Sequence, residues 1–243
     1  TGDDATAATP ADTRKFVELV HKVRSSALSV IELHFLARHI VPPGKTMGMS
    51  EETAARIVGE LETIVLGVNA DVDALTEPTG AELDDLRTTR VDHAITQKLA
   101  AETKVDVSVI DFLMAHILTS STPLPEHPAI TDFYVGHDDN TEAARTMTLR
   151  RLDKLALLAQ RFELQRAEWE WMYPTSGQNI LKTMPLAPLM DESDYRAQFR
   201  RLALFIDYAT LRDGMPDKAK TLLGIDEVIG KLNANQVTTA QFF

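Results

Sequence analysis

Histidine and carboxylate side chains are the groups in this sequence whose chemistry could support catalysis or metal binding. Glu18 and His21 have the Glu-x-x-His spacing found in helical di-iron proteins. Such a site needs two of these motifs and further glutamates, and the sequence contains one copy. His34 and His39 are five residues apart, which is about 140° around a helix, so they cannot easily bind one metal ion together. We therefore interpret these histidines as surface or half-buried residues and predict no cofactor.

A second set consists of His116, the doublet His137-Asp138 and the distant Asp207. In order and helical context this set resembles the histidine–aspartate metal-dependent phosphohydrolases. The resemblance implies that the doublet binds a divalent metal ion, that other His and Asp residues complete its shell, and that metal-bound water attacks a phosphoester. Here the doublet lies in the polar segment 136–140, whereas that family has it in an apolar helix. The alternative is that Asp138 and Asp139 only cap the helix that follows.

No nucleophilic site is evident from the sequence. The chain has no cysteine, which excludes thiolate chemistry and disulfides, and it has no Gly-x-Ser-x-Gly motif. Gly44-Lys45-Thr46 matches the end of a phosphate-binding loop, but His39 stands where the motif requires its first glycine. The sequence thus favours a protein without enzymatic activity.

Helices must position these residues, and one long helix dominates the sequence. Asp139 and Glu142 have the spacing of a capping box, and Pro174 ends the helical pattern. Apolar residues recur between them at helical spacing. They are Leu152, Leu155, Ala156, Ala159, Phe162, Trp169 and Tyr173. A helix of about 30 residues in the stretch 139–173 would be roughly 45 Å long, so we predict that the domain is built around it.

The remaining amphipathic segments predict a single compact all-α domain of seven to nine helices, without a sheet. Ser50 and Asp106 are expected to cap two of these helices. We expect residues 1–9 to form a flexible N-terminal arm and residues 10–243 to form the helical domain. Three prolines in the segment 119–128 cannot continue a helix, which makes this segment a possible subdivision of the domain.

Charge and hydropathy exclude several classes of partner. The chain carries a net charge of −11, and residues 1–140 hold 23 acidic and 11 basic side chains. This acidic half would repel phosphate backbones, so we predict no nucleic-acid binding. The longest apolar runs are too short for a membrane span. The absence of cysteine favours an intracellular location.

We predict that the long helix carries a surface that binds a partner protein. Trp169 and Trp171 are about 200° apart around the axis, so we assign Trp169 to the core and Trp171 to an interface. The other interface candidates are Arg150, Arg151 and Arg161, which could instead pair with the acidic half of the chain. We predict a non-enzymatic helical subunit or scaffold that contacts another protein chain or itself. The alternatives are the metal-dependent phosphohydrolase and a helical pocket for an apolar small molecule.

Overall fold

The computed structural model of this chain describes residues 10–118, 128–135, 141–175 and 191–214, together with residues 186 and 188. Every element of regular secondary structure in these ranges is a helix, which confirms the predicted all-α class. These ranges contain eight α-helices, one π-helix and one 3-10 helix. The expected N-terminal arm, residues 1–9, lies outside the described residues.

The chain forms two compact units. One comprises residues 1–38 with 189–243, and the other comprises residues 39–188. The boundaries between the units therefore lie near residues 38 and 188. The subdivision expected near 119–128 falls within the second unit, and residues 119–127 lie outside the described part of the chain.

The unit formed by the two ends of the chain contains α1 (Pro10–Ser25), α2 (Val30–Arg38) and α8 (Glu192–Gly214). Helix α8 packs against both other helices. Lys22 Nζ lies 2.6 Å from Asp207 Oδ2, which joins α1 to α8. The Arg38 guanidinium lies 4.8 Å from the centre of the Tyr195 ring, a cation–π contact between α2 and α8. The unit also buries apolar residues, among them Leu36 and Ile206.

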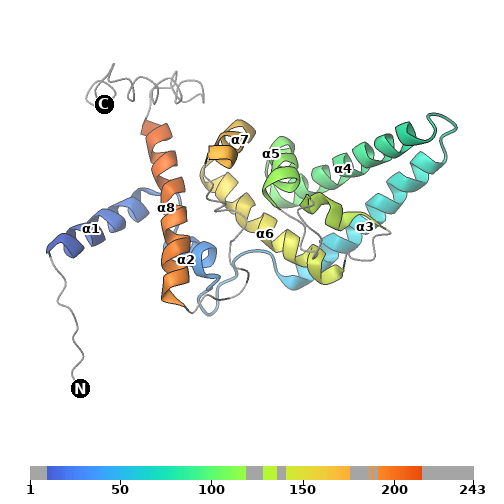
Figure 1. Cartoon of the computed structure of the whole chain (residues 1–243). Helices are drawn as coiled ribbons and strands as arrows, with labels where there is room; N and C mark the ends of the chain where they lie inside the picture. Colours follow the sequence, from blue (N-terminus) through green and yellow to red (C-terminus); the bar gives the residue numbers. More distant parts are fainter. Residues whose placement is uncertain are drawn as a thin grey trace, which may run out of the picture. The chain divides into compact units, whose positions relative to one another are not determined.

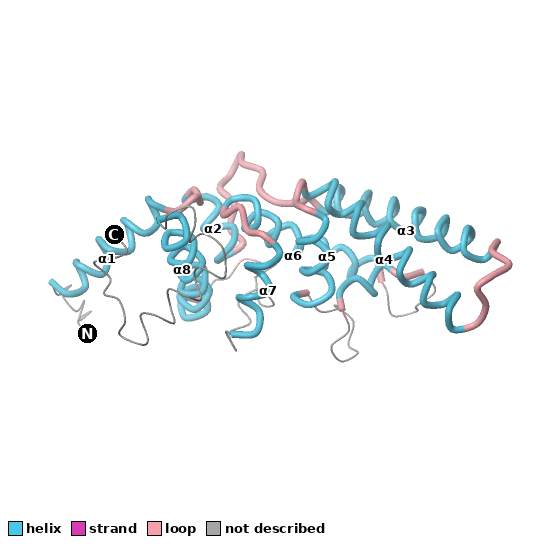
Figure 2. Tube along the Cα trace, turned by 90° about the horizontal axis from the view of Figure 1, so that it is seen from above, coloured by secondary structure: helices cyan, strands magenta, loops and turns pink. Residues whose placement is uncertain are grey.

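The second unit begins with a helical hairpin and continues with shorter helices. Its elements are α3 (Glu51–Asp73), α4 (Ala81–Thr103), α5 (Val107–Phe112), the π-helix η1 (Leu113–Ile117), the 3-10 helix η2 (Ala129–Phe133), α6 (Glu142–Arg161) and α7 (Arg166–Thr175). Figures 1 and 2 show α3 and α4 side by side, with their connecting loop pointing away from α5, α6 and α7. The core of this unit is mainly apolar, and the polar residues Asp132, Thr148 and Lys154 are also fully buried. It includes Ile57, Leu61, Ile95, Leu99, Leu113, Met114, Leu152, Leu155 and Trp169, each at most 1% exposed.

The prediction of one continuous helix over 139–173 is wrong. Helix α6 ends at Arg161 because Glu163 adopts a left-handed conformation with φ of 49°. The Leu164 N–H then donates to the Ala159 carbonyl oxygen at 3.0 Å, which closes the end of α6. Helix α7 starts anew because the Glu168 carboxylate accepts a 2.6 Å hydrogen bond from the Gln165 N–H. Apolar residues keep their helical spacing across the break, so this spacing alone could not reveal where α6 ends and α7 begins.

Side-chain caps set the start of several helices in this unit. Ser50 accepts a hydrogen bond from the Thr53 N–H at 3.1 Å, and Asp106 accepts one from the Ser108 N–H at 2.8 Å. Both predicted caps are thus confirmed. Thr141 caps α6, whereas the expected cap Asp139 lies outside the described residues.

Four charged residues join α3 to α4 near the start of α3 and the end of α4. Arg56 lies 2.6 Å from Glu60 and 2.9 Å from Glu102. Lys98 lies 2.5 Å from Glu60 and 2.7 Å from Glu102. Each cation therefore pairs with one carboxylate from each helix, and the four form a closed ring of ion pairs. At the opposite end of the hairpin, Gly80 supplies the positive φ of 64° that precedes α4.

None of the described helices combines the length and the apolar content that crossing a bilayer requires.

Candidate functional site

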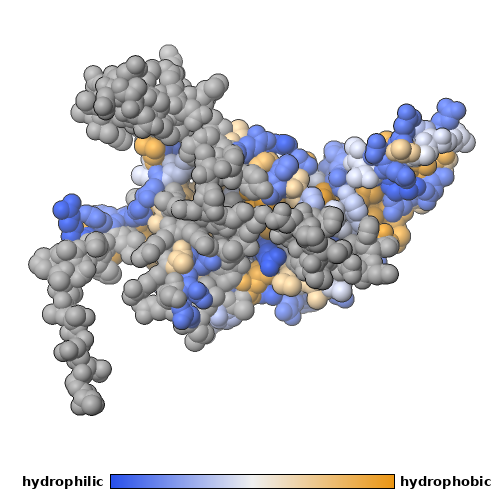
Figure 3. All heavy atoms as spheres, in the orientation of Figure 1, coloured by the Kyte–Doolittle hydropathy of each residue, from blue (hydrophilic) through white to orange (hydrophobic). Residues whose placement is uncertain are grey.

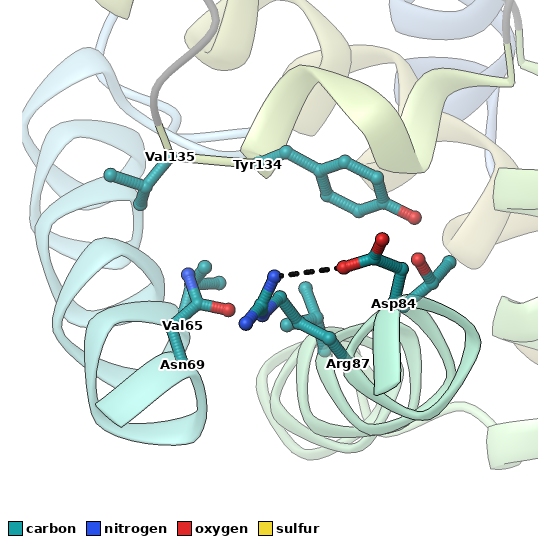
Figure 4. A pocket seen from close by; sticks show the side chains of 8 residues that line it. Val65, Asn69, Asp84, Arg87, Tyr134 and Val135 are labelled. Atoms are coloured by element: carbon teal, nitrogen blue, oxygen red, sulfur yellow. Dashed lines mark hydrogen bonds and ion pairs between the residues drawn. The ribbon is translucent and has the colours of Figure 1, made fainter. Parts of the chain in front are cut away.

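A pocket lies where the hairpin meets the end of η2 (Figure 4). It has a volume of about 280 Å³. Its lining comes from three stretches of chain: Val65 and Asn69 on α3, Asp84, Arg87, Thr88 and Val91 on α4, and Tyr134 and Val135 after η2. The α3 residues are four apart and the α4 residues recur at three and four, so each helix turns one face to the pocket. The three valines form apolar walls, and the other side chains supply polar groups.

Arg87 occupies the middle of the pocket lining and is neutralised by carboxylates. Its Nη2 lies 2.5 Å from Asp73 Oδ1, and its Nη1 lies 3.2 Å from Asp84 Oδ1. Figure 4 shows the guanidinium between Asn69 and Asp84. Because two carboxylates surround one cation, this part of the hairpin keeps a net negative charge.

The Tyr134 hydroxyl fixes the wall formed by η2. It donates a 2.6 Å hydrogen bond to Asp92 Oδ1 on α4. Burial raises the pKa of Asp92, and the hydrogen bond from Tyr134 opposes that increase. The same burial and bond raise the pKa of the Tyr134 phenol. The phenol therefore stays protonated near neutral pH and acts as a donor.

Asn69 contributes an unsatisfied polar atom to the wall. Its Oδ1 is enclosed by the protein and accepts no hydrogen bond among the described residues. A buried acceptor without a partner costs about 1–3 kcal/mol relative to a satisfied one. The fold therefore carries a polar group here that does not stabilise it.

The surface around the pocket is acidic. We define the hairpin tip as residues 69–92, which hold seven acidic and two basic side chains, a net charge of −5. Figure 3 shows mainly hydrophilic residues at this end of the molecule. Leu66 and Leu75 are exceptions, with 51% and 37% of their surfaces exposed. The pocket thus lies within a strongly negative surface that also exposes apolar side chains.

The predicted interface residue Arg150 makes contacts inside its own unit. Its Nη2 lies 3.0 Å from His39 Nε2 and 3.4 Å from the Leu186 carbonyl oxygen. Its Nη1 lies 3.8 Å from Glu51 Oε1. Burial and the charges of Lys154 and Arg150 lower the pKa of His39 to about 4, so this imidazole is neutral at neutral pH. Arg150 therefore attaches the segment preceding α3 to α6.

A lysine buried in α6 lies beside this contact. The Lys154 side chain is completely buried, and burial together with the charge of Arg150 lowers its pKa to about 7. Asp153 opposes this effect. Asp153 also accepts a 2.8 Å hydrogen bond from the Met49 N–H, which holds the same segment against α6. This cluster joins parts of the fold, and Lys154 changes its protonation near neutral pH.

The other predicted interface residues lie on α6 and α7. Arg151 is partly buried, and Arg161 is exposed in the last turn of α6. Trp171 lies in α7, and its side chain is outside what the structure describes. Trp169 is completely buried, which confirms its assignment to the core.

Of the four proposed metal ligands, the described part of the chain includes His116 and Asp207, which belong to different compact units. His116 is exposed on η1, where its ring centre lies 4.9 Å from that of Phe112. Asp207 is exposed on α8 and pairs with Lys22. His137 and Asp138 lie outside the described residues. The described residues contain no group of three or more histidines and carboxylates that could hold a metal ion.

Comparison with protein-family models, curated proteins and solved structures found no match for this chain. The candidate site therefore rests on the geometry of this molecule. None of the selected residues that the structure describes lines the pocket, because its three stretches of chain are joined only by the tertiary fold. The spacing of Asp84, Arg87, Thr88 and Val91 was visible as one face of a helix, but such a face is typical of a solvated surface.

Proposed function

We propose that this chain is a non-enzymatic helical subunit that works through protein–protein contacts, with the α3–α4 hairpin as the contacting element. The observation that carries the proposal is the hairpin tip, which points away from the rest of its unit in Figures 1 and 2. Leu75 exposes apolar surface within the tip, and Leu66 exposes apolar surface just before it. We take these exposed apolar side chains, in a polar surface, as the candidate contact residues.

The chemistry of the pocket supports recognition rather than catalysis. Arg87 and Asp84 pair with each other, and Tyr134 donates to Asp92. Catalytic acids and bases commonly have a pKa close to the working pH, and they need access to the substrate. Lys154 has such a pKa but is completely buried. An intracellular location, favoured by the absence of cysteine, stays a prediction from the sequence.

Association of the full chain tests the proposal directly. Light scattering and native mass spectrometry would measure self-association, and capture from the native source with tagged full chain would recover a partner. Replacing Leu66 by serine should weaken the association at least about fivefold, as expected for an interface residue that contributes more than 1 kcal/mol. Leu211, which is 43% exposed on α8, provides a matched control.

The control makes the result specific to the hairpin. Leu211→Ser should leave the association unchanged, and both variants should keep the circular dichroism spectrum and melting temperature of the wild type. A chain that is strictly monomeric and recovers no partner would contradict the proposal. So would equal effects of Leu66→Ser and Leu211→Ser.

A further inference from the structure

The pocket on the hairpin has the size and lining of a receptor for one long side chain. Pockets for drug-sized ligands usually measure roughly 300–1,000 Å³. At about 280 Å³ this pocket lies just below that range. Its apolar surface comes from Val65, Val91 and Val135, whereas Asp84 and Thr88 provide oxygen atoms. A ligand that fits must therefore combine an apolar stem with a polar end.

The charges around the pocket select the sign of that polar end. Asp73, Asp84 and Asp92 lie on or next to the lining, and Arg87 is the cation among them. Since Arg87 already pairs with two of these carboxylates, it leaves an excess of negative charge. The net charge of −5 over the hairpin tip extends this potential beyond the pocket. A cationic group is thus attracted, and an anionic one is repelled.

We infer that the pocket receives a lysine side chain from a basic segment of a partner protein. The lysine stem has four methylene groups that can pack on the valines, and its ammonium is a compact charge with three donors. Asp84 Oδ atoms and the Thr88 hydroxyl are suitable acceptors. Arginine is a poorer fit, because it would bring a second planar guanidinium beside that of Arg87, whereas the ammonium of lysine is a compact charge. The inference rests on the proposed function and names the chemistry of the partner.

Binding of a short basic peptide tests this inference on the full chain. The probe is pentalysine, and the measurement is a titration followed by the NMR signals of the Val65 and Val91 methyl groups. We expect saturable shifts of these signals, and an affinity that falls with added salt. A pentaglutamate peptide should give no shifts. Pentaornithine, which carries the same charge on a stem one methylene shorter, should bind more weakly because less apolar surface is buried.

Two neighbouring aspartates give a matched pair of variants. Asp84 lines the pocket, whereas Asp85 is adjacent on α4 and does not line it, and both are exposed. Each substitution by asparagine removes one negative charge from the hairpin tip. Asp84→Asn should weaken pentalysine binding at least about threefold more than Asp85→Asn does, as expected for a direct ion pair.

Each contrary result overturns the inference without overturning the proposed function. Equal weakening by both variants would show diffuse attraction to the hairpin tip and no occupied pocket. Absence of pentalysine binding would show that the partner is not recognised through a basic segment. In both cases an association that is weakened by Leu66→Ser would still support the helical subunit. The proposed function is contradicted separately, if the full chain shows no such association.

Discussion

The buried lysine of α6 should make the stability of this protein depend on pH in a predictable direction. In the unfolded chain Lys154 releases its proton near the ordinary lysine pKa of 10.5, whereas in the folded protein the pKa is about 7. Between these values the unfolded chain binds more protons, so the free energy of unfolding rises with pH. Below about pH 7 both states are protonated, and the folded state carries the full cost of a buried charge. A pKa difference of one corresponds to about 1.36 kcal/mol. The lowering of the Lys154 pKa from 10.5 to about 7 therefore corresponds to a cost of roughly 5 kcal/mol.

Replacing Lys154 by methionine should remove this cost, because methionine fills a similar space without a charge. We expect Lys154→Met to be more stable than the wild type by up to about 5 kcal/mol at about pH 6. The difference should shrink steadily as the pH rises toward about 10. Urea denaturation followed by circular dichroism at several pH values would measure it. Lys45→Met, at an exposed position, is the control and should show no such trend.

Two results would refute this reasoning. One is a difference in stability that shifts in favour of Lys154→Met as the pH rises, which would show that the ammonium stabilises the fold. The other is a difference from the wild type that does not change with pH. Either result would mean that the side chain does not lose its proton more easily in the folded protein than in the unfolded chain.

Four further predictions concern the helices and the pocket. Trp169→Ala should lower the free energy of unfolding by about 3–5 kcal/mol, because it empties a fully enclosed site. Helical spacing predicts that Trp171→Ala instead leaves the melting temperature unchanged and weakens association, and equal destabilisation by both substitutions would contradict this. Asn69→Leu should raise the free energy of unfolding, measured by urea denaturation, by about 1 kcal/mol, because it removes an unsatisfied acceptor. A loss of stability would show that this acceptor is satisfied in the wild type. Glu163→Gly should raise the melting temperature, with a gain of up to about 1 kcal/mol from relief of the left-handed conformation. A lower melting temperature would mean that backbone freedom in the unfolded chain outweighs that relief.

The sequence predicted the helical class, the caps at Ser50 and Asp106, and the burial of Trp169, because each depends on neighbouring residues. It failed at the break between α6 and α7. There the apolar period continues, while Gln165 and Glu168 form part of a capping box. The spacing of three between Gln165 and Glu168 was visible in the sequence. It did not predict a helix start, because glutamine is not among the preferred capping residues. The same spacing with a strong capping residue occurs at Ser29 and Glu32, where both reciprocal hydrogen bonds form.

The candidate site could not be predicted in the same way. Val65 and Val91 lie on different helices of the hairpin, and Tyr134 reaches them from a segment more than 40 positions later. No local pattern shows that these residues meet. Asp84 and Arg87 taken alone form an ion pair three residues apart on one helix, which is common on solvated surfaces. Their significance comes from the valines and from Tyr134, which only the tertiary fold places beside them.

The ring of ion pairs between α3 and α4 has a consequence for the motions of the hairpin. It joins the helices through residues 56–60 and 98–102, far from the connecting loop. Opening of the hairpin should therefore begin at the loop and stop at the ring, as a local unfolding event separate from global unfolding. Amide hydrogen exchange would then be fastest around residues 74–80 and slow progressively toward the ring. A partner bound at the hairpin tip would protect these amides, so its binding free energy would include the cost of ordering them.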